Sequence, residues 1–206
     1  MKERLAAAGL ETQQKWMEAA KEIPIYDKSE VVTKFLLMFA ANDAICTQDG
    51  LVRGKKGSVP VLDVESWNTT SVEHIAPQTA DGDWKNSKYL EFYNPQGKRY
   101  LHGLGNLLLL PKEVNSSLQN KDWEYKKKIY MALAQKDPQK AQGIIDGLEL
   151  KKETVAALQS QQKYFVLVEN IVGPTYSYSA WLPALAEARG EILLQLAFDN
   201  LFDFLN

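Results

Sequence analysis

An adjacent carboxylate and imidazole stand in residues 73–78, Glu-His-Ile-Ala-Pro-Gln, where a predicted strand runs into a loop. The imidazole of His74 has a reference pKa of about 6.5, so it can accept a proton at neutral pH. The carboxylate of Glu73 is a hard oxygen ligand that suits Mg²⁺. Neighbours on an extended strand point to opposite faces, so both side chains can serve one site only if the backbone bends, and we expect Pro77 to cause that bend.

Two asparagines follow, nine positions apart. Asn106 lies in an apolar run, residues 104–111, Leu-Gly-Asn-Leu-Leu-Leu-Leu-Pro, where an amide is costly unless it is hydrogen-bonded. We therefore expect Asn106 to tie down neighbouring loop backbone. Asn115 comes early in the next predicted helix and offers a neutral oxygen ligand that points back toward the strands. Taken alone, Asn115 is more typical of a helix N-cap, and the two roles are compatible.

The elements that must position these residues follow from periodicity and from stop signals. The pattern predicts a small strand–loop–strand–helix centre between helical flanks. Helices are expected over Glu3–Glu22, Glu30–Ile45 with Ser29 as its cap, Lys112–Gln135, Glu153–Val172 and Ser179–Phe204; strands over Trp67–Pro77 and Leu104–Pro111; and irregular loops over Gln48–Pro60 and Thr79–Arg99. The run from Leu107 to Leu110 is expected to be core, and so are Trp123 and Tyr130.

Composition excludes several classes of protein. With 206 residues, 45% of them apolar and 24% charged, the chain is typical of a soluble globular protein. The single cysteine, Cys46, cannot form an internal disulfide, and a lone cysteine excludes a Cys-ligated zinc site. It is compatible with a reducing cytoplasm. The N-terminus lacks the apolar core of a signal peptide, and no apolar stretch is long enough to span a membrane.

The charge distribution gives mixed evidence about nucleic acid. The formal charge of −2 provides no global basic footprint, which argues against a DNA binder dominated by electrostatics. Between Asp83 and Lys128, however, nine Lys/Arg face five Asp/Glu, so this middle carries +4 and the rest −6. A locally basic centre suits contact with phosphate, although a solvated helix face explains the same count, and charge alone favours that explanation.

We call residues 73–78, Glu-His-Ile-x-Pro-Gln, the first box and residues 105–110, Gly-Asn-Leu-x-Leu-Leu, the second box. The two boxes and the nine-residue spacing of the asparagines closely resemble the HNH (His-Me finger, ββα-metal) nuclease superfamily. Within it, the chain resembles the C-terminal domains that follow a ParB-like nucleotide-hydrolysing domain in GmrSD-type modification-dependent restriction enzymes and in phosphorothioation-linked nickases. A segment similar to Asn120-x-x-Trp-x-x-Lys-x-x-x-Tyr130 follows the second asparagine in that group. A closing helix similar to Ala184-Leu185 to Arg189 occurs there as well. The resemblance is specific from about Val72 to Tyr130.

The resemblance implies a role for each matching residue. His74 would be the general base that activates water, Glu73 and Asn115 would hold one Mg²⁺, with Mn²⁺ able to substitute, and Asn106 would brace the hairpin. Many HNH enzymes have Asp or His at the position of Glu73, so this chain departs from the family pattern here, and the longer side chain of Glu73 still supplies an oxygen ligand. Weaker candidates for nucleic-acid contacts are Arg99, His102, Lys121 and Lys126.

Each of these weaker candidates also has a structural explanation. His102 either orders the loop before the second box or contacts phosphate or metal. Lys126 and the two lysines after it mostly form a solvated helix face, with at most one member on phosphate. A lone histidine beside a glutamate is usually a surface pair, and it is the agreement of the two boxes with the spaced asparagine that favours a site.

Together these features predict an α+β, mostly helical chain with a ββα-metal finger embedded between helical flanks. We expect an N-terminal helical flank and loop over residues 1–66, a nuclease core over 67–135 with a long insertion at 79–103, and a C-terminal helical flank over 136–206. The expected function is a DNA endonuclease in bacterial defence, as the effector part of a larger protein. The alternatives are a non-catalytic DNA-binding or assembly module and an RNA-cutting variant. The chain has no nucleotide-binding motif, so a ParB-like partner domain or subunit would bind any nucleotide.

Overall fold

A β-hairpin joined directly to a helix forms the centre of the fold. The computed structural model describes residues 7–10, 12–160, 162–173 and 178–205, and within them β3 (Thr70–His74) pairs antiparallel with β4 (Leu107–Pro111). The register places Glu73 opposite Leu108 and His74 opposite Leu107. Helix α7 (Lys112–Leu118) begins as soon as β4 ends. The predicted strand–strand–helix arrangement is therefore confirmed, with strands shorter than expected.

Apolar burial holds this hairpin in place. The side chains from Leu107 to Leu110 are fully buried, as are Val114 and Leu118 on the inner face of α7. In a strand that is buried on both faces, apolar and polar residues do not alternate, and the apolar residues follow one another directly. This explains the four consecutive leucines. Trp123 and Tyr130 are also core residues, as predicted.

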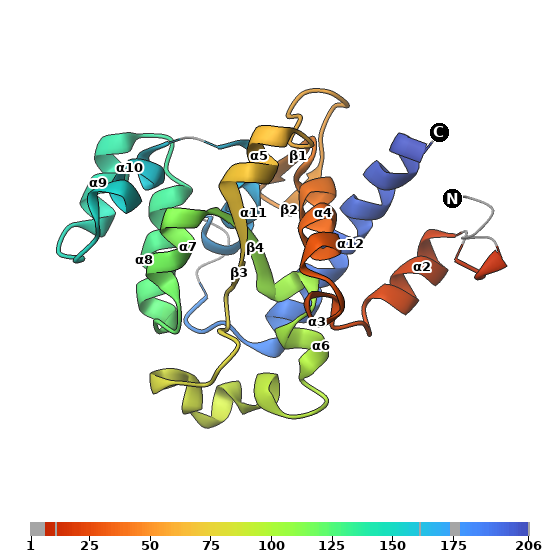
Figure 1. Cartoon of the computed structure of the whole chain (residues 1–206), viewed down its shortest axis with the longest axis horizontal. Helices are drawn as coiled ribbons and strands as arrows, with labels where there is room; N and C mark the ends of the chain where they lie inside the picture. Colours follow the sequence, from red (N-terminus) through yellow and green to blue (C-terminus); the bar gives the residue numbers. More distant parts are fainter. Residues whose placement is uncertain (1–6, 11, 161, 174–177, 206) are drawn as a thin grey trace.

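Helices enclose the hairpin on both sides (Figure 1). Helices α7 and α8 (Trp123–Leu133) lie on one side, and α4 (Glu30–Ala41), α3 (Ile25–Lys28), α6 (Lys98–Leu101) and α12 (Pro183–Leu205) lie on the other. The other α-helices among the described residues are α2 (Gln13–Ala20), α5 (Val64–Thr69), α9 (Pro138–Ile145), α10 (Lys152–Gln159) and α11 (Val166–Val172). The fold is thus mostly helical α+β, as expected. No helix in this described part of the chain is long and apolar enough to cross a membrane.

The long connection between β3 and β4 is built from short turns. Two 3-10 helices, η1 (Gly82–Lys85) and η2 (Ser87–Tyr93), lead to α6, and a third, η3 (Leu104–Asn106), leads into β4. This segment caps one end of the hairpin (Figure 1), and the buried ring of Trp84 anchors it by donating from Nε1 to the carbonyl of Lys121 at 3.0 Å. The segment is irregular in the sense predicted, yet it is packed onto the fold.

A second hairpin was not predicted. The sequence suggested a helix to Ile45 followed by a loop, whereas α4 ends at Ala41 and β1 (Ala44–Thr47) pairs with β2 (Gly50–Arg53). The expected N-cap is correct, since Ser29 Oγ accepts from the N–H of Val32 at 3.2 Å. The helix ends early because Asp43 has a φ of 59° and its carboxylate accepts two backbone N–H groups from the following loop, at 2.8 Å each.

Three helices predicted as continuous are broken. The prediction over Lys112–Gln135 is wrong at Gln119, whose φ of 38° separates α7 from α8, and Asp122 caps α8 by accepting from Tyr125 N at 2.8 Å. The prediction over 153–172 is divided into α10, η4 (Lys163–Phe165) and α11. The first helix is interrupted at Gly9, whose φ is 69°, and the start of its predicted range, residues 3–6, lies outside the described residues.

Candidate active site

Asn106 is the brace of the site. Its side chain is fully buried at the end of η3. Its Oδ1 accepts from the N–H of Ala76 at 2.8 Å and from Trp181 Nε1 at 2.9 Å, and its Nδ2 donates to the carbonyls of Ala76 and Leu101 at 2.9 Å each. One amide thus fixes the turn that follows His74 and ties it to the start of α12. These are the loop-backbone bonds that the sequence predicted, with Trp181 as an additional partner.

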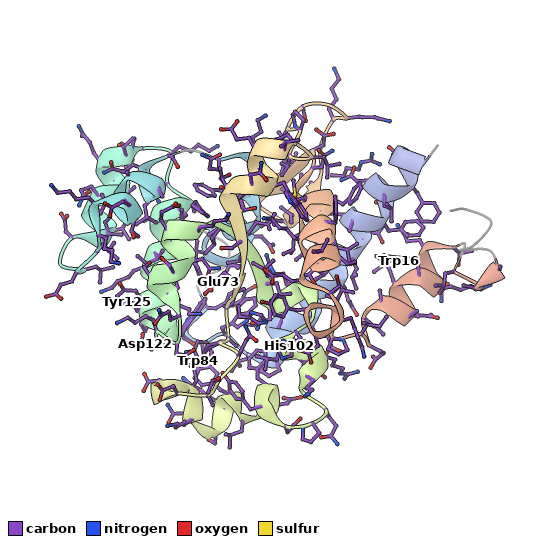
Figure 2. The ribbon with its side chains drawn as sticks, viewed as in Figure 1. Trp16, Glu73, Trp84, His102, Asp122 and Tyr125 are labelled. Atoms are coloured by element: carbon purple, nitrogen blue, oxygen red, sulfur yellow. The ribbon has the colours of Figure 1, made fainter. Side chains whose placement is uncertain are left out.

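Glu73 is held inside the protein by two residues of α8. Figure 2 labels it between β3 and that helix. Its Oε1 accepts from Lys126 Nζ at 2.6 Å and from the hydroxyl of Tyr130 at 3.1 Å. Lys126 also donates to the carbonyl of His74 at 2.6 Å. Residues four apart on a helix share a face, which explains the spacing of Lys126 and Tyr130 in the sequence. Both contacts use Oε1, so Oε2 lies outside this ion pair.

Burial shifts the pKa values of Glu73 and Lys126. Burial raises the pKa of the Glu73 carboxyl, and the Lys126 ammonium beside it opposes that shift. Burial likewise lowers the pKa of Lys126, against the attraction of Glu73. A buried charge is costly unless it is paired and hydrogen-bonded, and each of these groups supplies the partner of the other.

His74 lies on the opposite side of β3 from Glu73, as strand alternation requires. Its ring is 5% exposed, and its Nε2 lies 3.2 Å from Nδ1 of His102. Burial, followed by the nearby His102 and Lys126, lowers the pKa of His74 to about 3. The imidazole is therefore neutral at neutral pH and has a lone pair that can accept a proton, while the same shift makes it a weaker base than an ordinary histidine.

Asn115 joins the helix to the first strand. Its Nδ2 donates to Ser71 Oγ at 2.8 Å and to the carbonyl of Val72 at 3.0 Å. Because Asn115 lies inside α7, it is not the N-cap, which is Pro111. With both amide hydrogens used by β3, the lone pairs of Oδ1 are the part of the side chain left to bind something else.

One cavity of about 360 Å³ lies between β3, α7 and the Pro77 turn. The side chains of Glu73 and His74 leave β3 on opposite faces, toward α8 and α3. Glu73, His74 and Asn115 all contribute to its wall. A carboxylate and an amide oxygen are hard ligands, and Mg²⁺ usually keeps several waters, for which a cavity of this size has room. The donor set therefore fits Mg²⁺ chemically. Among the described residues no group of three or more His, Cys, Asp or Glu could hold a metal, so an ion here would depend on mixed oxygen ligands and water.

The candidate nucleic-acid contacts fall in different places. The expectation that Lys126 lies on a solvated helix face is wrong, because its ammonium is fully buried against Glu73. Arg99 does not line this cavity; its guanidinium pairs with Glu22 at 2.6 Å. Lys121 is exposed and lies over the ring of Tyr125, one residue beyond the cavity wall at Asn120. His102 is buried behind His74, with its Nδ1 3.2 Å from Nε2 of that residue.

Several residues of the site were missed in the sequence. Lys112 is exposed and lines the cavity, and its place three residues before Asn115 on the same helix could have indicated a shared face. Arg189 is buried and donates to the carbonyls of Gly105 and Leu107 at 2.8 and 3.0 Å, which holds the second box. Asp27 lies 3.4 Å from Nε2 of His102, and no local motif marks it.

A family model described as GmrSD restriction endonucleases, C-terminal domain, matches residues 21–195, which include both hairpins, α3 and Arg189. A search of curated proteins found no match.

Proposed function

Because the chain belongs to the family of GmrSD restriction endonuclease C-terminal domains, we propose that it is a metal-dependent DNA endonuclease of the HNH type. The observation that carries this proposal is the shared cavity, which brings a neutral imidazole, a carboxylate and an amide oxygen to one hairpin-and-helix unit. The family is one of restriction endonuclease domains, and the cavity supplies residues competent for phosphodiester hydrolysis.

His74 would take a proton from the water that attacks the phosphodiester. Asn106 keeps the following turn in place, and Lys126 with Tyr130 keeps Glu73 oriented. Mg²⁺, or Mn²⁺ in its place, would bind Glu73 and Asn115 and neutralise the charge that develops on the phosphate and the leaving oxygen. Lys112 at the cavity wall would attract the phosphate backbone. The products would carry 5′-phosphate and 3′-hydroxyl ends.

The biological setting is part of the same proposal. A restriction endonuclease family favours DNA as the substrate and defence against foreign DNA as the role. A ParB-like nucleotide-hydrolysing domain or subunit would bind any nucleotide that the system uses. One site of this kind cuts one strand, so a single copy would nick DNA. The competing function is a non-catalytic DNA-binding module. It is less favoured because the base, ligand and brace positions are all occupied by competent residues.

A plasmid assay tests the proposal. Supercoiled DNA is incubated with the wild type, His74→Ala and, as a matched surface control, Lys128→Ala, with Mg²⁺ or Mn²⁺ and with a chelator. We expect metal-dependent nicking by the wild type and the control and none by His74→Ala, with circular dichroism showing that all three are folded. Equal nicking by His74→Ala would remove this residue from the mechanism. Cleavage of a matched RNA but not of DNA would favour the RNA-cutting alternative.

Asn115 provides a separate prediction about the metal. Removal of the amide in Asn115→Ala takes away one oxygen ligand, so the Mg²⁺ concentration that gives half-maximal nicking should rise at least about tenfold. Asn86→Ala, an exposed amide on η1–η2, is the control. An unchanged Mg²⁺ dependence would mean that Asn115 serves only to join α7 to β3.

A further inference from the structure

A chain of three polar side chains runs from the cavity back to α3. His74 Nε2 lies 3.2 Å from His102 Nδ1, and His102 Nε2 lies 3.4 Å from Asp27 Oδ1. The two histidine residues are buried, at 5% and 7% exposure, whereas the side chain of Asp27 is 37% exposed. None of the sequence boxes contains Asp27, so this arrangement exists only through the packing of α3 against α6.

Tyr26 contacts the rings of both His74 and His102 and holds them in place. Its backbone N–H donates to the carbonyl of His102 at 3.1 Å. Its ring meets His74 edge-on, with centroids 4.5 Å apart at 88°, and stacks near His102 at 6.1 Å and 12°. The neighbouring residue on α3, Asp27, is thereby fixed beside the far nitrogen of His102, which is labelled at the edge of the hairpin in Figure 2.

The order of the contacts, from Asp27 through His102 to His74, decides which ring nitrogen carries each proton. A carboxylate 3.4 Å from Nε2 of His102 favours a proton on that nitrogen. A neutral imidazole has one donor and one acceptor, so Nδ1 of His102 is then an acceptor. The group facing it, Nε2 of His74, must be the donor. Nδ1 of His74 is left with its lone pair.

We propose that Asp27 and His102 are positioning residues that hold His74 as its Nε2–H tautomer and so make Nδ1 the base nitrogen. This inference rests on the proposed nuclease function. In the reaction, Nδ1 takes one proton from water as the new oxygen–phosphorus bond forms and the bond to the 3′-oxygen breaks, and that oxygen receives a proton from solvent. The positive charge gained by His74 faces His102 and, through it, the carboxylate of Asp27.

Nitrogen NMR tests the proposal directly, because the sequence has only two histidines. Protein labelled with ¹⁵N at histidine, without DNA, is studied by long-range ¹H–¹⁵N correlation, with His102→Gln to assign the signals. We expect both rings as Nε2–H tautomers in the wild type. In Asp27→Ala, His102 loses its preference and His74 becomes a mixture, while Lys28→Ala, the next residue of α3, changes neither. A His74 signal of the Nδ1–H type in the wild type would overturn the proposal.

Nicking rates provide the second measurement. Asp27→Ala should lower kcat about 10- to 100-fold with little change in KM, and Asp27→Asn, whose amide oxygen can still accept, should restore part of the loss. A wild type that nicks DNA while Asp27→Ala leaves the His74 tautomer unchanged would overturn this inference and keep the proposed function. The expected tautomers in a protein that never nicks DNA would keep the tautomer assignment and overturn the proposed function.

Discussion

The buried ion pair between Lys126 and Glu73 explains a motif that local pattern leaves ambiguous. A lysine on an amphipathic helix is ordinarily a solvated residue, and the sequence places Lys126 in a run of three lysines. Its burial depends on Glu73, which is 53 positions away and reaches it across the hairpin. This pairing is a tertiary contact between residues that are distant in the sequence, so helical periodicity could not predict it.

Removal of one member of this pair should destabilise the protein strongly. Lys126→Met leaves the Glu73 charge buried without its partner, and we expect a loss of about 3–5 kcal/mol in the free energy of unfolding, measured by urea denaturation. Lys128→Met, an exposed change of the same type two residues away, should cost less than about 0.5 kcal/mol. The double variant Glu73→Met with Lys126→Met should recover much of the loss. Equal stability of the two single variants would show that the pair contributes nothing.

The buried imidazole of His74 should make the fold acid-sensitive. Its folded pKa is about 3 and its ordinary value is 6.5, so below about pH 6.5 the unfolded chain binds a proton that the folded chain does not. The stability from this group is complete above pH 6.5 and is lost as the pH falls toward 3. Between about pH 7.5 and about pH 5 the loss should be about 2 kcal/mol.

Urea denaturation at both pH values measures this loss. His74→Gln should show a shallower decline than the wild type, although not a flat one, because burial also lowers the pKa of His102. Identical declines in the two proteins would contradict the assignment to His74.

At the scale of elements, the turn after β3 depends on one amide. Asn106→Ala removes four hydrogen bonds and leaves the buried donors of Ala76 and Trp181 without that partner. Each such group costs about 1–3 kcal/mol, so we expect at least about 3 kcal/mol of lost stability and a lower melting temperature, measured by calorimetry. The exposed Asn86→Ala is the control. A variant that melts like the wild type yet fails to nick DNA would contradict the bracing role.

The elements also show how far sequence reasoning reaches. The strands predicted over residues 67–77 and 104–111 contain both strands of the hairpin, because a continuous apolar run and a proline stop are local signals. Helix breaks at Asp43 and Gln119 were missed, since neither residue is a glycine or proline although both have a positive φ. At Asp43 the carboxylate accepts from Gly57 and Val59, which are distant in the sequence. For the candidate site, the motifs and their spacing pointed to Glu73, His74 and Asn115. Asp27 was missed because it joins the site only through packing, and Lys112 was missed although its place three residues before Asn115 is a local signal.

At the scale of the whole molecule, the two ends of the chain close around the hairpin. Helix α12 packs against both α4 and η3, so elements far apart in the sequence hold the second box from behind (Figure 1). Arg189 and Trp181 tie this C-terminal region to η3 and Asn106. An apolar cavity of about 330 Å³ lies beside these contacts, between α2, α4 and α12, away from the candidate site.

The backbones of η3 and α12 lie in close contact at Gly105, and this contact gives the last prediction. A Cβ added at Gly105 would lie 1.6 Å from the carbonyl oxygen of Ala186 and 2.7 Å from the nitrogen of Gly190, so α12 would have to move. Gly105→Ala should therefore lower the free energy of unfolding by at least about 2 kcal/mol in urea. Gly143→Ala, exposed on α9 with no atom within 4 Å, should instead raise it by about 0.5–1 kcal/mol. Neither glycine has a positive φ, so the difference isolates the contact with α12. Equal effects in the two variants would show that α12 does not press on the second box.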